Sequence, residues 1–169
     1  MTVTLFAQPY DISASGFYFE TVEDYDNQVD KAVNDFGQQI EEFEIQFIDG
    51  EALDCAFAMV WGLHQGNLSA FIEAAENWDE DRKRRYIIAV GECGYAHDDV
   101  ADDPGHEGVD IYYLDGLRDL AESFVEEGLY GPIPDALQFY IDYDAISRDL
   151  AVDFSETEIA GERLVYACR

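Results

Sequence analysis

DGLRDLAESFVEEGLYGPIPDALQFYIDYDAISRDL, the stretch from Asp115 to Leu150, joins an amphipathic helix to a second acidic, tyrosine-rich segment. In its first half apolar residues recur at i, i+3, i+4, i+7, i+8 and i+12, a spacing that predicts one continuous helical stripe. The stripe consists of Leu117, Leu120, Ala121, Phe124, Val125 and Leu129. We expect Asp115 to cap this helix, because a short carboxylate can accept a hydrogen bond from a first-turn N–H.

The opposite face of the same helix is acidic and carries Asp119, Glu122, Glu126 and Glu127. Carboxylates four residues apart lie about 6 Å apart along a helix axis, which is similar in scale to the spacing of neighbouring phosphates on a DNA strand. The second segment adds Asp142, Asp144 and Asp149, which we expect to be exposed. These positions are candidate partner-binding residues.

Two runs of residues in this stretch resemble the ArdA antirestriction proteins. One is the run from Leu114 to Leu129, and the other is YIDYDA at residues 140–145, followed by RDL at residues 148–150. Ser147 stands where the family is expected to have a smaller Gly or Ala. The resemblance extends more loosely over the rest of the chain, whose length and acidity also suit the family.

The resemblance implies a homodimeric DNA mimic, carried by mobile genetic elements, that occupies the DNA-binding groove of type I restriction-modification enzymes at their methyltransferase core. Foreign unmethylated DNA would then escape cleavage. The carboxylates expected at phosphate-like positions are Asp115, Asp119, Glu122, Glu126, Glu127, Asp142, Asp144 and Asp149. The expected fold is α+β and elongated, with three small modules in tandem. These are a small antiparallel sheet plus helix at 1–50, a helical module at 51–107, and an α+β module at 108–169 that carries the acidic helix and the dimer contact.

The charge of the chain needs a physical reason, because 38 acidic residues face only 9 Lys and Arg, giving a formal net charge of −29. Such an excess destabilises a compact protein through self-repulsion. Adaptation to high salt, cation binding and a basic partner are the three reasons that composition leaves open. At one charge per ~1.7 Å of duplex, 29 charges match about 49 Å of DNA. The same acidity argues against direct binding to nucleic acid.

Patterns along the remaining chain predict a small sheet followed by helices. We expect a hairpin from Val3–Ala7 and Gly16–Glu20, a helix from Tyr25 to Phe36 that ends at Gly37, and a strand at 43–47. Helical patterns then run from Glu51 to about Cys93. The last of these helices, from about Trp78, carries four consecutive basic residues at 82–85, which we expect to pair with nearby acids. A strand at 109–114, a helix from Asp135 and a final hairpin at Gly161 complete the prediction.

The polar stretch from His97 to Gly108 is predicted to be a loop and is the best candidate boundary between modules. It fails the spacing of a calcium-binding EF-hand, and Cys93, His97 and His106 match no standard zinc site. The three cysteines, at 55, 93 and 168, contain no CxxC pair, and we expect free thiols in a reducing compartment. We find no signal peptide and no apolar run of about 20 residues, so we expect a cytoplasmic protein without membrane contact.

An enzymatic function is not indicated. The sequence contains no GxGxxG, GxxxxGK[ST], GxSxG or HExxH motif, and we predict neither a cofactor nor catalytic residues. Close pairs of carboxylates are expected by chance among 38 acids, so they nominate no general acid. Two alternatives to restriction inhibition stay open: an acidic inhibitor of another DNA-binding protein, and a salt-adapted acidic structural domain.

Overall fold

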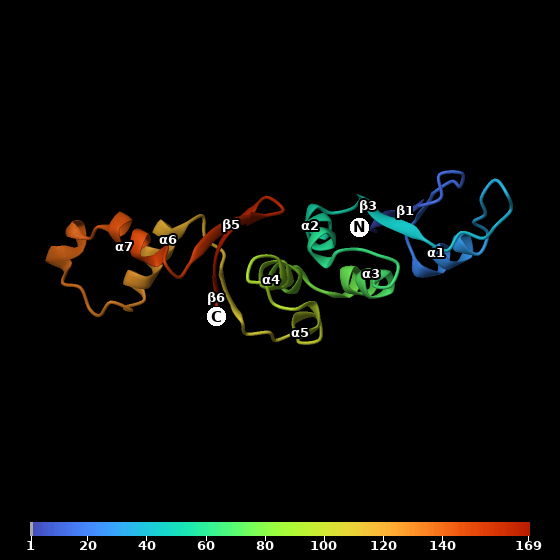
Figure 1. Ribbon diagram of the computed structural model, residues 1–169. Coiled ribbons are helices and arrows are strands. Elements are labelled where there is room, and N and C mark those ends of the chain that lie inside the picture. The colour runs from blue at the N-terminus through green and yellow to red at the C-terminus, as the bar shows by residue number, and fades with distance from the viewer. Residues whose placement is uncertain (1) are drawn as a thin grey trace. The chain divides into compact units, whose positions relative to one another are not determined.

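The computed structural model describes residues 2–169 and has an α+β fold that divides into two compact units (Figure 1). Unit 1 extends to Ile87, and unit 2 runs from Ile88 to Arg169. The α+β class agrees with the sequence prediction, whereas the boundaries at residues 50 and 107 stay a prediction.

A three-stranded antiparallel sheet forms the first part of unit 1. It contains β1 (Thr4–Pro9), β2 (Phe17–Phe19) and β3 (Phe43–Asp49) in the order β2-β1-β3. The predicted hairpin is confirmed, since Leu5 of β1 lies opposite Phe19 of β2. One face of the sheet packs on α1 (Val22–Val29), where Tyr25 contacts the rings of Phe19 and Phe43. Aromatic burial therefore holds the sheet and this helix together.

Helix α1 is shorter than the sequence pattern predicted, because it ends at Val29 and not at Phe36. The chain turns at Asn34, whose side-chain Oδ1 accepts hydrogen bonds from the backbone N–H groups of Phe36 and Gln38 at 2.9 and 3.0 Å. Asn side chains compete in this way with the helical hydrogen bonds of the backbone. Gly37 lies within this turn and does not follow a helix end.

The predicted helical part of unit 1 is confirmed as α2 (Ala52–Trp61), α3 (Leu68–Asn77) and α4 (Glu80–Gly91), the last of which crosses into unit 2. These helices pack around an aromatic cluster in which Phe57 lies 5.2 Å from Trp61, 5.5 Å from Phe71 and 5.2 Å from Tyr86 between ring centroids. Such pairs add to the free energy of burial through their ring geometry.

The sequence predicted that the four basic residues of α4 pair with nearby acids, and this is confirmed for Lys83, Arg84 and Arg85. The Arg82 guanidinium lies 3.8 Å from the centre of the Trp78 ring, and Arg84 and Arg85 pair with Glu80 and Asp81 four residues earlier. Lys83 is buried and its Nζ lies 2.6 Å from Asp54 Oδ1. The largest cluster of positive charge in the chain is therefore compensated from within unit 1.

Unit 2 contains a second antiparallel sheet with the order β4-β6-β5, formed by β4 (Val109–Tyr112), β5 (Ser155–Ile159) and β6 (Glu162–Cys168). Between β4 and β5 the chain forms α6 (Leu117–Glu126), the 3-10 helix η1 (Asp135–Tyr140) and α7 (Tyr143–Leu150). The predicted last hairpin turns at Ala160 and Gly161, both with positive φ, as a tight two-residue hairpin turn requires.

Two features of unit 2 differ from the sequence predictions. The stretch from His97 begins with a short helix, α5 (His97–Ala101), and becomes a loop only afterwards. Cys93 and Cys168 form a disulfide, so the expectation of three free thiols is wrong for two of them, and only Cys55 is a free cysteine. The pairing was not visible in the sequence because 75 positions separate the two residues.

Candidate partner-binding surface

The acidic surface of unit 2 is positioned by the apolar stripe of α6. Leu120, Ala121, Phe124 and Val125 are buried as predicted. Leu120 and Phe124 pack with Val165 of β6, and the Phe124 ring meets Tyr112 and Phe154 with centroids 5.8 Å away. Leu129 is an exception, because the helix ends before it and its side chain is exposed. Burial of the stripe turns the opposite face of α6 toward solvent.

The N-terminus of α6 is not capped by Asp115, contrary to the sequence prediction. Gly116 is the capping position, and the Leu117 backbone N–H donates to Glu156 Oε1 at 2.7 Å. A Cβ on Gly116 would stand 2.8 Å from that carboxylate oxygen, so glycine allows the close approach. Glu156 lies on β5, 39 positions away, and its carboxylate satisfies a first-turn donor in the place of a local cap. Asp115 is left as an exposed acid.

Arg118 joins the two acidic helices. Its guanidinium lies 2.6 Å from Asp144 Oδ1 on α7 and 3.4 Å from Glu122 Oε1 on α6. The hydrogen bond and charge of Asp144, followed by those of Glu122, raise the pKa of Arg118 above its ordinary value. Two of the eight candidate carboxylates are thus partly neutralised by a cation of their own chain, which weakens their electrostatic attraction to a basic partner.

Two further candidates are engaged in hydrogen bonds. Asp142 caps α7, since its Oδ1 accepts the Ala145 backbone N–H at 2.9 Å. Glu127 Oε1 accepts the Ser123 hydroxyl at 3.0 Å. Both acids are exposed to solvent. They can meet a partner while supporting the local structure.

The remaining four candidates form a set that we call the unpaired carboxylates. Within residues 2–169 their side chains make no hydrogen bond or ion pair. Of the four, Asp119 is half-buried and the others are exposed. Asp119 and Glu126 stand seven positions apart on α6, two turns along one face. The unpaired carboxylates are Asp115, Asp119, Glu126 and Asp149.

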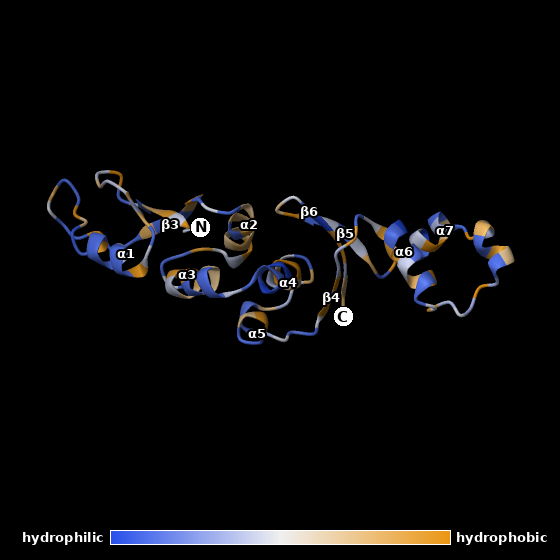
Figure 2. Ribbon diagram, turned by 180° about the vertical axis from the view of Figure 1, so that it is seen from behind, coloured by the Kyte–Doolittle hydropathy of each residue, from blue (hydrophilic) through white to orange (hydrophobic). Residues whose placement is uncertain are grey.

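Beside the acids, unit 2 exposes a run of large apolar side chains around η1. Phe139 is 96% exposed and Tyr140 is 81% exposed, and Leu129, Tyr130 and Leu137 are also exposed. In Figure 2 the segment next to α7 accordingly carries the hydrophobic colour. Of the tyrosines in this segment, Tyr140 is not in the core and Tyr143 is half-buried.

Sequence reasoning missed Arg118 and Glu156 as organisers of this surface. The spacing of Arg118 and Glu122, four positions apart, was a visible signal for an ion pair on a helix. Nothing local indicated Asp144 or Glu156 as partners, because 26 and 39 positions separate them from the atoms they contact.

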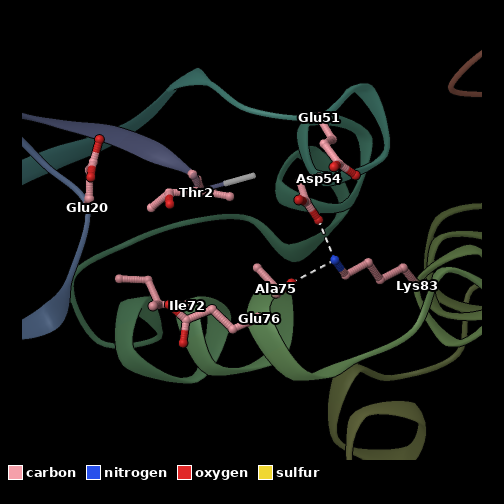
Figure 3. A pocket seen from close by; sticks show the side chains of 9 residues that line it. Thr2, Glu20, Glu51, Asp54, Ile72, Ala75, Glu76 and Lys83 are labelled. Atoms are coloured by element: carbon pink, nitrogen blue, oxygen red, sulfur yellow. Dashed lines mark hydrogen bonds and ion pairs between the residues drawn. The ribbon is translucent and has the colours of Figure 1, made fainter.

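Unit 1 contains a separate cavity of about 320 Å³ whose lining includes the Lys83–Asp54 ion pair (Figure 3). Lys83 Nζ also donates to the Ala75 carbonyl at 2.7 Å. The wall contains the acids Glu20, Glu51 and Glu76. Because Lys83 links α2, α3 and α4 through two short contacts, the pair acts as a structural connection between these helices.

Across residues 2–169 no helix combines the length and the apolar character that crossing a bilayer requires. In that same part of the chain, no three His, Cys, Asp or Glu side chains are grouped so that they could hold a metal ion.

Comparison with known protein families gives a match for this chain. The family model described as antirestriction protein (ArdA) matches residues 6–161, nearly the whole chain. A comparison with curated proteins gives no match.

Proposed function

This chain belongs to the ArdA family of antirestriction proteins, and we propose that it inhibits type I restriction-modification enzymes by mimicking DNA. Its carboxylates would occupy the DNA-binding groove of the methyltransferase core in place of phosphates. Foreign DNA would then escape cleavage. The family consists of inhibitors, and we propose no catalytic activity for this member.

The observation that carries the proposal is the charge balance of the acidic surface. From Asp98 to Glu158 the chain has 18 acids and only two bases, Arg118 and Arg148. Arg118 is held between Glu122 and Asp144, and the unpaired carboxylates are left without a partner from their own chain within residues 2–169. A groove that binds DNA presents Lys and Arg with competing counterions, and binding of carboxylates there releases those ions. Association should therefore be fast and should weaken steeply with salt.

We also propose that the protein is an elongated homodimer whose contact lies within residues 108–169. The exposed aromatic side chains of η1 support this, since aromatic residues are enriched at interfaces and contiguous apolar patches mark them. Light scattering of the wild type and of the Phe139→Ser, Tyr140→Ser variant tests the contact. A dimeric wild type and a monomeric variant are expected, and small-angle scattering of a compact monomeric wild type would contradict the proposal.

The direct test is cleavage of unmethylated plasmid by a purified type I enzyme while this protein is titrated in at several salt concentrations. Inhibition that competitor DNA relieves, and that weakens as salt rises, is the expected result. A protein that leaves cleavage intact well above the enzyme concentration would refute DNA mimicry toward this class of enzyme.

Two other candidate functions follow from the same charge. An inhibitor of another DNA-binding protein would compete with DNA for that protein and leave the type I enzyme unaffected. A salt-adapted structural domain would bind neither, and its acids would serve hydration alone. Because the proposed target acts on DNA inside the cell, we propose a cytoplasmic location.

A further inference from the structure

Two loops of unit 1 expose apolar side chains at the same end of the sheet. The loop between β1 and β2 carries Ile12, which is fully exposed, and the loop between α1 and β3 carries Phe36, which is 83% exposed. Tyr10 and Val33 are exposed beside them. In Figures 1 and 2 the two loops lie side by side beyond α1. We call these four residues the loop tip.

A hydrogen-bond network holds the two loops together. Asn34 Nδ2 donates to Asp11 Oδ2 at 3.0 Å, across 23 positions, and the Asp35 backbone N–H donates to Ser13 Oγ. Asp11 Oδ1 in turn accepts from the backbone N–H and the hydroxyl of Ser13 at 2.9 and 2.8 Å. These hydrogen bonds, that of Asn34 first, lower the pKa of Asp11 below its ordinary value. The loop tip is therefore preformed, which reduces the entropy lost when a partner binds.

An acidic hollow of about 260 Å³ lies next to the loop tip. Its lining includes Tyr10, Ile40 and three acids, Asp11, Glu41 and Glu42. None of the residues that line the hollow is basic, and Lys31 is the only Lys or Arg before Arg82 in the sequence. A hollow that combines Tyr10 and Ile40 with three carboxylates suits the apolar stem and cationic head of a lysine or arginine.

We propose that the loop tip docks into an apolar depression on the inhibited enzyme, flanked by Lys or Arg side chains, one of which enters the acidic hollow. The inference rests on the proposed function, because it takes that enzyme as the partner. A second copy of this chain fits less well, since the same acids would face one another in a symmetric contact. Nucleic acid and anionic membranes are disfavoured by the same charges.

The test measures binding of the full-length protein to a purified type I enzyme for the wild type, the Ile12→Ser, Phe36→Ser double variant and a control. The control is Met59→Ser, which replaces a side chain that is 79% exposed on α2, away from both loops. We expect the double variant to bind at least about tenfold more weakly, which corresponds to about 1.4 kcal/mol. The control should bind like the wild type, and both should keep the wild-type melting temperature.

A second variant separates the network from the apolar contact. Asn34→Ala leaves Ile12 and Phe36 in place but removes the bond to Asp11, and we expect a smaller loss of affinity, several-fold. Equal binding by the double variant and the wild type would overturn the inference while the proposed function stands. A change in the mass of the double variant in solution, at unchanged affinity for the enzyme, would reassign the loop tip to contacts between copies and would also overturn it. A wild type that binds no type I enzyme would refute the proposed function itself and the partner with it.

Discussion

Reduction of the Cys93–Cys168 disulfide should destabilise unit 2 strongly. The crosslink closes a loop across 75 positions that includes β4, α6, α7 and both strands of the last hairpin. In the chain-entropy description, a loop of that length removes about 15 cal/mol/K from the unfolded state, or about 4.5 kcal/mol at 25 °C. Native disulfides that have been removed from small domains typically cost about 2 to 5 kcal/mol, so the two figures agree.

The other contacts at the C-terminal end of β6 will not compensate for the loss of the disulfide. Arg169 pairs with Asp110 at 2.8 Å, and its backbone N–H donates to the Gly108 carbonyl at 2.9 Å. The ion pair is exposed, so water and salt screen it and it adds little to stability. With a urea dependence of about 1 to 2 kcal/mol/M for a small unit, loss of the disulfide should lower the unfolding midpoint of unit 2 by about 2 to 4 M.

The two tryptophans make the assay selective, because Trp61 and Trp78 both lie in unit 1. Urea unfolding is followed by tryptophan fluorescence and by far-ultraviolet circular dichroism for the wild type and for Cys93→Ser, Cys168→Ser. The matched control is Cys55→Ser, which removes the free thiol and leaves the disulfide. The dichroism midpoint should fall much more than the fluorescence midpoint, and the control should shift neither. Coincident, unshifted curves for the double variant would refute the argument.

Three further predictions concern the core and the acidic surface. Lys83→Met should lower the free energy of unfolding by about 3 to 5 kcal/mol in the same urea titration, because the substitution leaves Asp54 buried and unpaired. The double variant Lys83→Met, Asp54→Leu should recover much of the lost stability. Burial raises the pKa of Tyr86 to about 12. Because this folded-state value lies above that of the unfolded chain, the contribution of neutral Tyr86 is complete below pH 10 and is lost as pH rises toward 12. The alkaline loss of stability should be smaller in Tyr86→Phe, and an identical pH profile would contradict this assignment. Replacing the four unpaired carboxylates by their amides should weaken inhibition of plasmid cleavage by at least about tenfold without lowering the melting temperature. The same change at Glu122 and Asp144 should weaken inhibition less, and it should release Arg118 from its ion pairs. Equal effects of the two sets would show that pairing with Arg118 does not matter for binding. The amide changes are Asp115→Asn, Asp119→Asn, Glu126→Gln and Asp149→Asn.

The sequence determined the elements whose cause is local. The spacing of Leu120, Phe124 and their neighbours fixed the buried face of α6, because helical periodicity places those residues on one side wherever the helix packs. The pairing of Arg84 with Glu80 followed from their separation of four positions on one helix. The acidity of the chain is a property of composition alone.

Tertiary structure decided the features that depend on residues distant in sequence. Glu156 caps α6 in place of Asp115 because sheet pairing carries β5 to that helix end. Arg118 pairs with Asp144 across 26 positions, and Cys93 forms its disulfide with Cys168 across 75 positions. Helix α1 ends early because the Asn34 side chain forms hydrogen bonds with Asp11 and with the backbone of its own turn. The periodicity of apolar residues contains no information about these hydrogen bonds. Which carboxylates are unpaired was therefore settled only by the folded chain, since each partner is chosen by proximity in space.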